Sequence, residues 1–148
     1  MMRKGPQRKV RSRVRAAIFN VPAMLGPFSK MRVFFHKLRG VNIGDDVEIG
    51  YHVIIDNVYP ERVTIEDGAT IAARTTILAH DESALYTGSG EEIIKSTRIC
   101  EGAFVGVHSV ILAGVTVGRR AIVGAGSVVN KDVPENAKVA GVPAKEIG

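Results

Sequence analysis

The stretch 99–134 decides the fold, because it can be written as six consecutive hexads: ICEGAF, VGVHSV, ILAGVT, VGRRAI, VGAGSV and VNKDVP. Every first position is Ile or Val, and every fifth position is Ala, Ser or Val. A period of six fits neither an α-helix nor a simple alternating strand, but it is typical of short strands joined by tight turns. The stretch therefore predicts a solenoid in which each coil of strands packs on its neighbours.

The same period is present earlier in the chain. IGDDVE and IGYHVI cover residues 43–54, and IEDGAT and IAARTT cover residues 65–76. We expect the first residue of each hexad to point inward in an aliphatic stack, and the small fifth residue to fit at a crowded corner. Glycine at the second position should relieve crowding and let the backbone turn. These glycines are Gly44, Gly50, Gly106, Gly118 and Gly124.

Two interruptions break the period. The first adds four residues after Ile55, and the second separates Ile77 from Ile99 by twenty-two positions, four more than three hexads. The second interruption begins at His80 and is polar and glycine-containing, as in a loop that leaves a solenoid. We expect a projecting loop at about residues 80–97, on a rigid scaffold where functional residues often lie.

Charge divides the chain into two parts. Residues 1–40 carry eleven Lys or Arg and no Asp or Glu, whereas residues 41–148 carry nine basic and fifteen acidic residues. We interpret residues 1–40 as a basic N-terminal arm with a short amphipathic helix at 29–40 that caps the first coil, and residues 41–148 as one β-helix domain. The apolar residues at helical spacing are Met31, Phe34, Phe35 and Leu38.

No segment predicts a membrane span. The apolar run 16–25 is too short, and Asn20 and Pro22 interrupt it. Cys100 is the single cysteine and cannot form an internal disulfide, so we expect a cytoplasmic protein. The clustered cations of the arm suit a peripheral contact with an anionic membrane surface. A disordered arm is the alternative, and nothing in the arm predicts a nucleic-acid-binding module.

The hexads, with the closing stretch IVGAGSVVNKDVPENAKVAGVPAKEI at 122–147, resemble the hexapeptide-repeat acyltransferases, and most closely the maltose, galactoside and polysaccharide O-acetyltransferases. The resemblance covers about residues 41–148. It implies an all-β fold, a left-handed parallel β-helix, and a homotrimer with active sites between subunits. It also implies acetyl-CoA as acyl donor, no required metal, and a sugar hydroxyl of a polysaccharide or glycolipid as acceptor.

The resemblance makes His80 the general base. A sugar hydroxyl is protonated at neutral pH, and a neutral imidazole can accept its proton while the oxygen attacks the thioester carbonyl. Cys100 offers an acyl-enzyme alternative, but its second hexad position favours a structural role. For His36 in the predicted capping helix, and for His52 and His108 at fourth hexad positions, we expect surface or subunit contacts. His52, His80 and His108 are spaced by 28 residues with no close pair, which does not suit the three-histidine zinc site of the gamma-type carbonic anhydrases.

Donor-binding candidates come from the positions that match the family. Exposed turn amides and cations suit the phosphates and pantetheine arm of coenzyme A. Phe104 stands where many relatives have Trp and should form an aromatic wall, while the two lysines would contact phosphate unless they are simply solvated. The donor candidates are Phe104, Gly106, Val107, Ala125, Asn130, Lys131 and Lys145.

Acceptor-binding candidates are Asp56 and Asn57 in the first interruption, with Arg74 as a weaker candidate. Asp56 and Asn57 fall one coil before His80 and could therefore lie beside it. Either residue would hold an acceptor hydroxyl or orient His80, or both would only cap the turn. A function of another class, a non-catalytic β-helix that serves as an assembly or binding module, stays open at this point.

Overall fold

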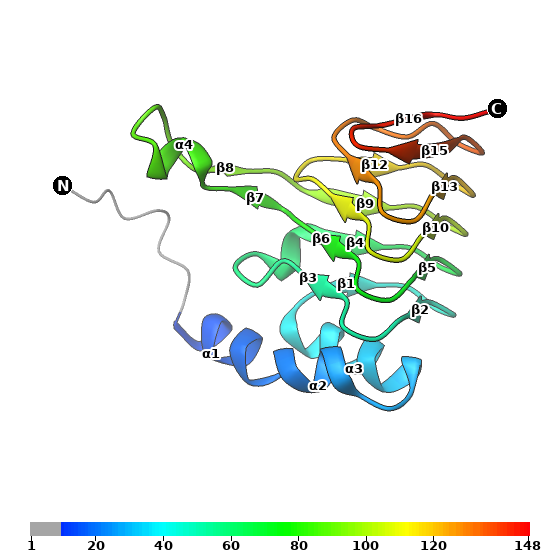
Figure 1. Cartoon of the computed structure of the whole chain (residues 1–148). Coiled ribbons are helices and arrows are strands. Elements are labelled where there is room, and N and C mark those ends of the chain that lie inside the picture. The colour runs from blue at the N-terminus through cyan, green and yellow to red at the C-terminus, as the bar shows by residue number, and fades with distance from the viewer. Residues whose placement is uncertain (1–9) are drawn as a thin grey trace.

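The computed structural model describes residues 10–148. Within them, three helices lie as a layer beneath a stack of strand coils (Figure 1). The helices are α1 (Val10–Ile18), α2 (Asn20–Leu25) and α3 (Ser29–Arg39). The helix predicted at 29–40 is therefore present, with Gly40 in a left-handed conformation (φ 107°) at its end. The sequence did not predict α1 and α2.

Three parallel sheets form the walls of the stack, and the chain passes through them in turn to give a left-handed parallel β-helix. Sheet A holds β1 (Asn42–Ile43), β4 (Val63–Ile65), β9 (Thr97–Ile99) and β12 (Thr116–Val117). Sheet B holds β2 (Glu48–Ile49), β5 (Thr70–Ile71), β10 (Phe104–Val105), β13 (Ile122–Val123), β15 (Lys138–Gly141) and the antiparallel β16 (Ala144–Glu146). Sheet C holds β3 (Ile54–Ile55), β6 (Thr76–Ile77), β11 (Val110–Ile111) and β14 (Val128–Val129).

The core follows the hexads. First-position residues stack in register from coil to coil, as Ile55 pairs with Ile77 and Ile77 with Ile111, and all three are 0% exposed. Fifth-position residues are buried at the corners, and those that carry a hydroxyl hydrogen-bond the next coil: Ser109 Oγ donates to the carbonyl of Gly124 at 3.1 Å. Both expectations for these positions are confirmed.

The corners turn at the fourth hexad residue rather than at the second. His52, Arg74 and His108 have φ of 56°, 60° and 57° at successive corners between sheets B and C. The second-position glycines are needed for space instead. A Cβ atom on Gly50 would lie 2.5 Å from the backbone N of Ala73 in the next coil. The expectation of crowding is thus confirmed, and the expectation that these glycines make the turn is wrong.

The helix layer covers the open edge of the first coil with polar side chains. Arg32 Nε donates to the carbonyl of Ile49 at 2.8 Å, and the backbone N–H of Ile49 donates to Ser29 Oγ at 2.9 Å. Arg39 Nη2 donates to the carbonyl of Ile55 at 2.9 Å. An unpaired strand edge needs such partners, because buried backbone polar groups are costly when unsatisfied. Helix α3 therefore caps the coil through hydrogen bonds.

Of the four apolar residues expected to make this contact, Phe35 and Leu38 are only half-buried, and the other two are exposed. Met31 and Phe34 are 40% and 56% exposed, whereas Arg32, His36 and Arg39 are the buried residues of α3. The helix is amphipathic as predicted, but its predicted packing face is wrong. The reason is that the partner surface is a row of backbone carbonyls rather than an apolar sheet face.

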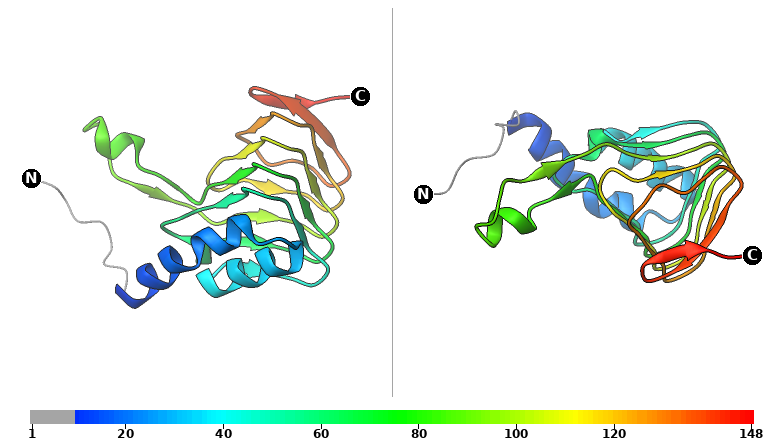
Figure 2. Two further views of the ribbon diagram at one scale, coloured as in Figure 1. Left: turned by 60° about the horizontal axis from the view of Figure 1, so that its bottom comes forward. Right: turned by 90° about the horizontal axis from the view of Figure 1, so that it is seen from above.

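The second interruption forms an arm that projects from the corner between sheets C and A (Figures 1 and 2). It consists of β7 (His80–Asp81), α4 (Ser83–Tyr86) and β8 (Ile93–Ile94), with β7 and β8 antiparallel. Ile77 is the last residue of β6 on sheet C, and Ile99, on β9 of sheet A, is the first residue of the next hexad. Ile99 pairs with Ile65 of the preceding coil, so the arm takes the place of a single corner. It therefore inserts sixteen residues into one hexad step, and contains no coil of its own.

The first interruption is shorter and lies at the same corner. It contains a 3₁₀ turn, η1 (Pro60–Arg62), before β4. At the other end of the chain, the basic stretch 3–9 of the predicted arm lies outside the described residues. Within residues 10–148, no helix combines the length and hydrophobicity needed to cross a bilayer.

Substitution of the corner glycines should separate the two roles. Gly50→Ala places a methyl against the backbone of the next coil and should cost about 2 kcal/mol or more of unfolding free energy. Gly68→Asn is the control, because Gly68 has a left-handed φ of 66° and open space around its Cα. It should cost less than about 1 kcal/mol. Urea unfolding measures both, and equal losses would contradict the proposed crowding.

His36 should make the stability of the protein pH-dependent. Burial, and then the Arg39 and Arg32 cations, lower the pKa of His36 from 6.5 to about 3. Below pH 6.5 the unfolded chain therefore binds a proton that the native protein does not bind. The free energy of unfolding decreases as the pH is lowered from about 6.5 to about 3. From pH 7 to pH 5 the loss should be about 2 kcal/mol.

The variant His36→Asn tests this origin of acid sensitivity. Its amide oxygen can still accept from Arg39, as His36 Nδ1 does at 3.0 Å, but it does not titrate. Urea unfolding at pH 7 and pH 5 should show a smaller loss for the variant than for the wild type. The same loss in both proteins would exclude His36 as its source.

Candidate active site

The two interruptions of the period meet at one corner and bring two predicted residues together. Asp56 follows β3 and His80 begins β7, one coil apart at the corner between sheets C and A. His80 Nδ1 lies 2.6 Å from Asp56 Oδ2. The Asp56 side chain is 0% exposed and that of His80 is 16% exposed. The structure therefore places a buried carboxyl directly against a partly accessible imidazole.

Asp56 is held by three backbone amides as well. Val58 and Tyr59 donate to its Oδ1 at 2.9 and 2.8 Å, and Ala79 donates to its Oδ2 at 2.7 Å. Burial alone would raise the pKa of this carboxyl, but these amides and His80 outweigh that effect and hold its pKa below the ordinary value. Asp56 is therefore a fixed carboxylate at neutral pH.

The Asp56 carboxylate fixes the tautomer of His80. A carboxylate only accepts hydrogen bonds, so His80 Nδ1 must carry the proton in their contact. In the neutral imidazole, Nε2 is then left with a free lone pair. This arrangement is what a general base needs: an accessible nitrogen acceptor whose ring is oriented by a second group.

Asn57 is turned toward the helix layer. Its Oδ1 accepts from Arg39 Nη2 at 2.9 Å, and the same nitrogen lies 3.2 Å from the carbonyl of Asp56. Arg39 thus connects the end of α3 with the loop that presents Asp56. The sequence did not single out Arg39.

Three further residues surround His80 and were not predicted. The Tyr59 ring meets the His80 ring edge-on, with centroids 5.5 Å apart, and Tyr59 Oη donates to Glu92 Oε2 at 3.1 Å. One side-chain ligand atom each of His80, Glu82 and Glu92 lies within 4.8 Å of the others. Tyr59 was visible in the first interruption, but no sequence signal pairs it with Glu92, because that contact depends on the folding of the arm.

Most donor candidates lie away from His80 within one chain. Gly106, Val107 and Ala125 occupy the corner between sheets B and C, where Gly106 N–H donates to the carbonyl of Val123 and Gly126 N–H to that of Val107. Phe104 lies on sheet B beside Ile122, and both Phe104 and Val107 are 43% exposed.

The remaining candidates are distributed over other parts of the surface. Asn130 and Lys131 are exposed and follow β14, at the same kind of corner as His80 but two coils further along. Lys145 is exposed on β16 at the end of sheet B. Arg74 is exposed at the corner between sheets B and C, one strand before His80. One chain therefore brings together Asp56 and His80, but not the donor candidates.

Cys100 lies at a different corner, between sheets A and B. Burial, and then the Glu66 carboxylate, raise the pKa of its thiol. A protonated thiol is a poor nucleophile, so this environment does not favour an acyl-enzyme at Cys100.

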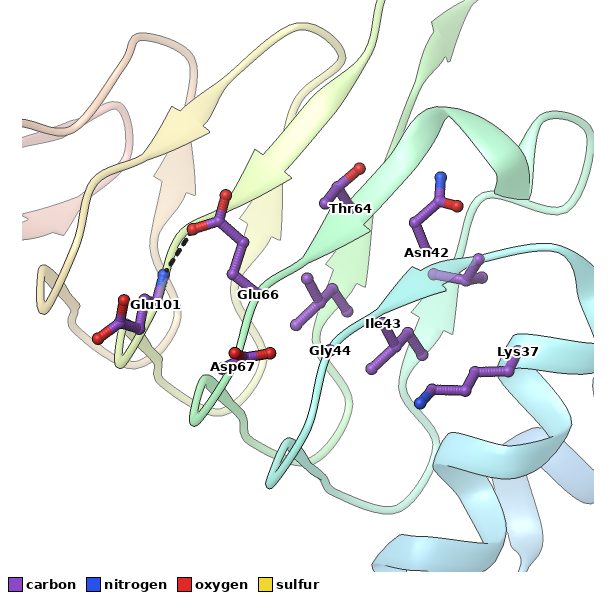
Figure 3. Close-up of a pocket in the computed structure, with 10 residues that line it drawn as sticks. Lys37, Asn42, Ile43, Gly44, Thr64, Glu66, Asp67 and Glu101 are labelled. Atoms are coloured by element: carbon purple, nitrogen blue, oxygen red, sulfur yellow. Dashed lines mark hydrogen bonds between the residues drawn. The ribbon is translucent and has the colours of Figure 1, made fainter.

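A surface hollow of about 510 Å³ lies on sheet A rather than at His80 (Figure 3). Its floor carries acidic side chains, and Glu66 Oε2 accepts from the backbone N–H of Glu101 at 3.0 Å. Its lining includes none of the predicted site residues. The hollow is therefore separate from the Asp56–His80 pair.

Comparison with known proteins identifies the same family as the hexads. Residues 96–131 match the family model described as "Bacterial transferase hexapeptide (six repeats)". The chain is 33% identical to the putative acetyltransferase YvoF of Bacillus subtilis, covering 82% of this chain and 68% of YvoF. It is 33% identical to galactoside O-acetyltransferase of Escherichia coli, covering 78% of this chain and 57% of that protein. It is 37% identical to the bifunctional protein GlmU of Thermosipho africanus, but spans only 28% of GlmU.

Solved structures of similar fold point to the same family. The hexapeptide-repeat acetyltransferase VCA0836 of Vibrio cholerae, complexed with acetyl-CoA, superposes with a TM-score of 0.72 and 25% identity, covering 93% of this chain and 86% of that chain. A galactoside acetyltransferase in complex with coenzyme A has a TM-score of 0.71 and 26% identity, covering 93% of this chain and 80% of that chain. With the fold, the repeats and these relatives in agreement, the chain belongs to the hexapeptide-repeat acyltransferase family.

Proposed function

We propose that this chain transfers an acetyl group from acetyl-CoA to a sugar hydroxyl, with His80 as general base. The observation that carries the proposal is the contact between Asp56 and His80, which leaves Nε2 of a partly accessible imidazole free to accept a proton. A β-helix that only served as an assembly module would have no use for a buried carboxylate against a histidine at the exit of an arm. We therefore favour an enzyme over a non-catalytic module.

The proposed reaction is a direct transfer. His80 Nε2 removes the proton of the acceptor hydroxyl while its oxygen attacks the thioester carbonyl, and the C=O becomes an oxyanion. When the carbonyl forms again, the C–S bond breaks, and the imidazolium returns the proton to the leaving thiolate. The Asp56 carboxylate stabilises the imidazolium between these two steps.

The donor candidates lead us to place the complete site between subunits of a homotrimer. VCA0836 and galactoside acetyltransferase were each solved with acetyl-CoA or coenzyme A. Here, Val107 and Ala125 are exposed at a corner where Gly126 has open space around it, which suits a pantetheine arm. Because this corner is not the one that holds His80, the donor groove of one subunit would serve His80 of the next.

The acceptor we favour is a sugar unit of a polysaccharide or glycolipid. Galactoside O-acetyltransferase is a relative, and Glu82, Glu92 and Tyr59 offer the oxygen-rich surroundings that bind hydroxyl groups. Arg74 would contribute only from a neighbouring subunit. We place the protein in the cytoplasm, in peripheral contact with a membrane through its basic arm, where a lipid-linked acceptor would be found.

Removal of the base tests the chemistry. His80→Ala should lower acetyl transfer by roughly 10²- to 10⁴-fold, measured as thiol release from acetyl-CoA with a panel of sugar acceptors. Asp56→Asn should also lower the rate, by roughly 10²-fold or more, because an amide no longer fixes the tautomer. Asp46→Asn is the control, since Asp46 is exposed at the corner between sheets A and B and Asn tolerates its left-handed φ of 52°. Turnover by His80→Ala at the wild-type rate would overturn the mechanism.

Mixed trimers test the division of the site. His80→Ala removes the base, and Ala125→Trp should block the donor groove, so each variant alone should be inactive. Co-expression with two affinity tags allows trimers of both variants to be purified. Such trimers should regain about one third of wild-type activity, because one of their three interfaces then pairs an intact His80 with an intact groove. No recovery in verified mixed trimers would place the whole site in one chain.

A further inference from the structure

The helix layer carries large apolar side chains that the rest of the described chain does not cover. Val14 and Ile18 are one turn apart on α1, and Val21 and Leu25 are one turn apart on α2, with exposures of 49%, 63%, 61% and 51%. The chain entering and forming α3 adds Phe28, Met31 and Phe34, with exposures of 72%, 40% and 56%. We call these seven residues the helix-layer surface. Apolar residues gathered on one structural layer indicate an interaction site.

Capping of the first coil does not explain these side chains. That contact is made by Arg32 and Arg39, which donate to carbonyls of Ile49 and Ile55. The apolar residues lie at other positions of the same helices and stay in contact with solvent. Helices that need only to cap a coil would carry polar residues at these positions, as most surface helices do.

The charge of the same segment selects the partner. Residues 1–40 contain eleven Lys or Arg and no acidic residue. Among the described side chains Arg15 and Lys30 are exposed, whereas Lys37 lines the hollow on sheet A. Apolar side chains flanked by cations are the composition of helices that lie in the headgroup region of anionic membranes. We propose that the helix-layer surface docks on an anionic lipid bilayer, with the apolar side chains inserted among the headgroups and the cations bound to their phosphates.

Two other partners fit this surface less well. A second copy that docked through its own helix layer would bring like charges together, because the segment has no acidic residue to pair with them. Nucleic acid would bind the cations, but exposed Phe28 and Ile18 would contribute nothing to phosphate contacts. A bilayer uses both the charge and the apolar residues.

The position of the arm is separate from this docking surface. Looking down the stack, α1 and the β7–α4–β8 arm project on the same side of the molecule (Figure 2, right). The tip of the arm lies toward the end of the stack opposite the helix layer (Figure 1). The docking of the helix layer therefore does not rest on the proposed acetyl transfer.

Vesicle binding tests the docking surface. The triple variant Ile18→Ser, Val21→Ser and Phe28→Ser removes one apolar residue from each of three adjoining segments. The matched control is Tyr86→Ser, Val142→Ser and Ile147→Ser, which removes equally exposed side chains elsewhere, at 82%, 71% and 50% exposure. Both are compared with the wild type by co-sedimentation with vesicles of phosphatidylglycerol and phosphatidylcholine in equal parts. Phe28→Ser alone replaces the triple variant if the latter does not fold.

We expect the wild type and the control to bind these vesicles, with weaker binding to pure phosphatidylcholine, and the triple variant to bind at least about tenfold more weakly. Wild-type binding by the triple variant, or no binding by the wild type, would overturn the proposal. The proposal would also be overturned if the triple variant changed its oligomeric state and still bound vesicles as the wild type does. The same holds if it kept binding duplex DNA with no loss of vesicle binding. His80→Ala should bind vesicles normally, which separates a failure of docking from a failure of the transfer chemistry.

Discussion

The close stacking of one coil on the next is the constraint on which the rest of the structure depends. At the second hexad position there is no room for a Cβ where the next coil lies closest, as at Gly50 and Gly106. Two of the three corners therefore keep a fixed length in every coil, and both interruptions occur at the third, between sheets C and A. Because only this corner tolerates extra residues, the arm, Asp56 and His80 all lie there.

The hexads allowed the coils and the nearness of Asp56 to His80 to be predicted from sequence, whereas the left-handedness and the role of His80 came from the resemblance to the acyltransferase family. Asp56 and His80 each follow the last regular residue of sheet C, so the period alone brings them to one corner in successive coils. Tyr59 and Glu92 could not be predicted in this way, since their hydrogen bond joins two irregular segments whose shapes follow no period. The loop predicted at about 80–97 contains the arm, but the composition of this stretch does not tell how many corners it replaces.

The capping helix shows where pattern reasoning gives the wrong contact. Amphipathic spacing assumes that the apolar face packs on the protein, which is correct when the partner is apolar. The end of a β-helix presents backbone carbonyls, so the side chains that gain most from burial there are donors, and Arg32 and Arg39 take that place. Arg39 also reaches Asn57 and the carbonyl of Asp56, so the same cap that closes the coil steadies the loop beside His80.

A triangular coil also limits what one chain can do. Its corners face in different directions, and the rigid stacking that fixes Asp56 against His80 prevents one corner from folding toward another. The glycine-rich corner with Gly106 and Ala125 therefore cannot approach His80 by a movement within the coil. A reaction that needs both surfaces must obtain one of them from a second chain, so the rigidity that fixes the His80 ring also makes association of subunits part of the proposed catalytic site.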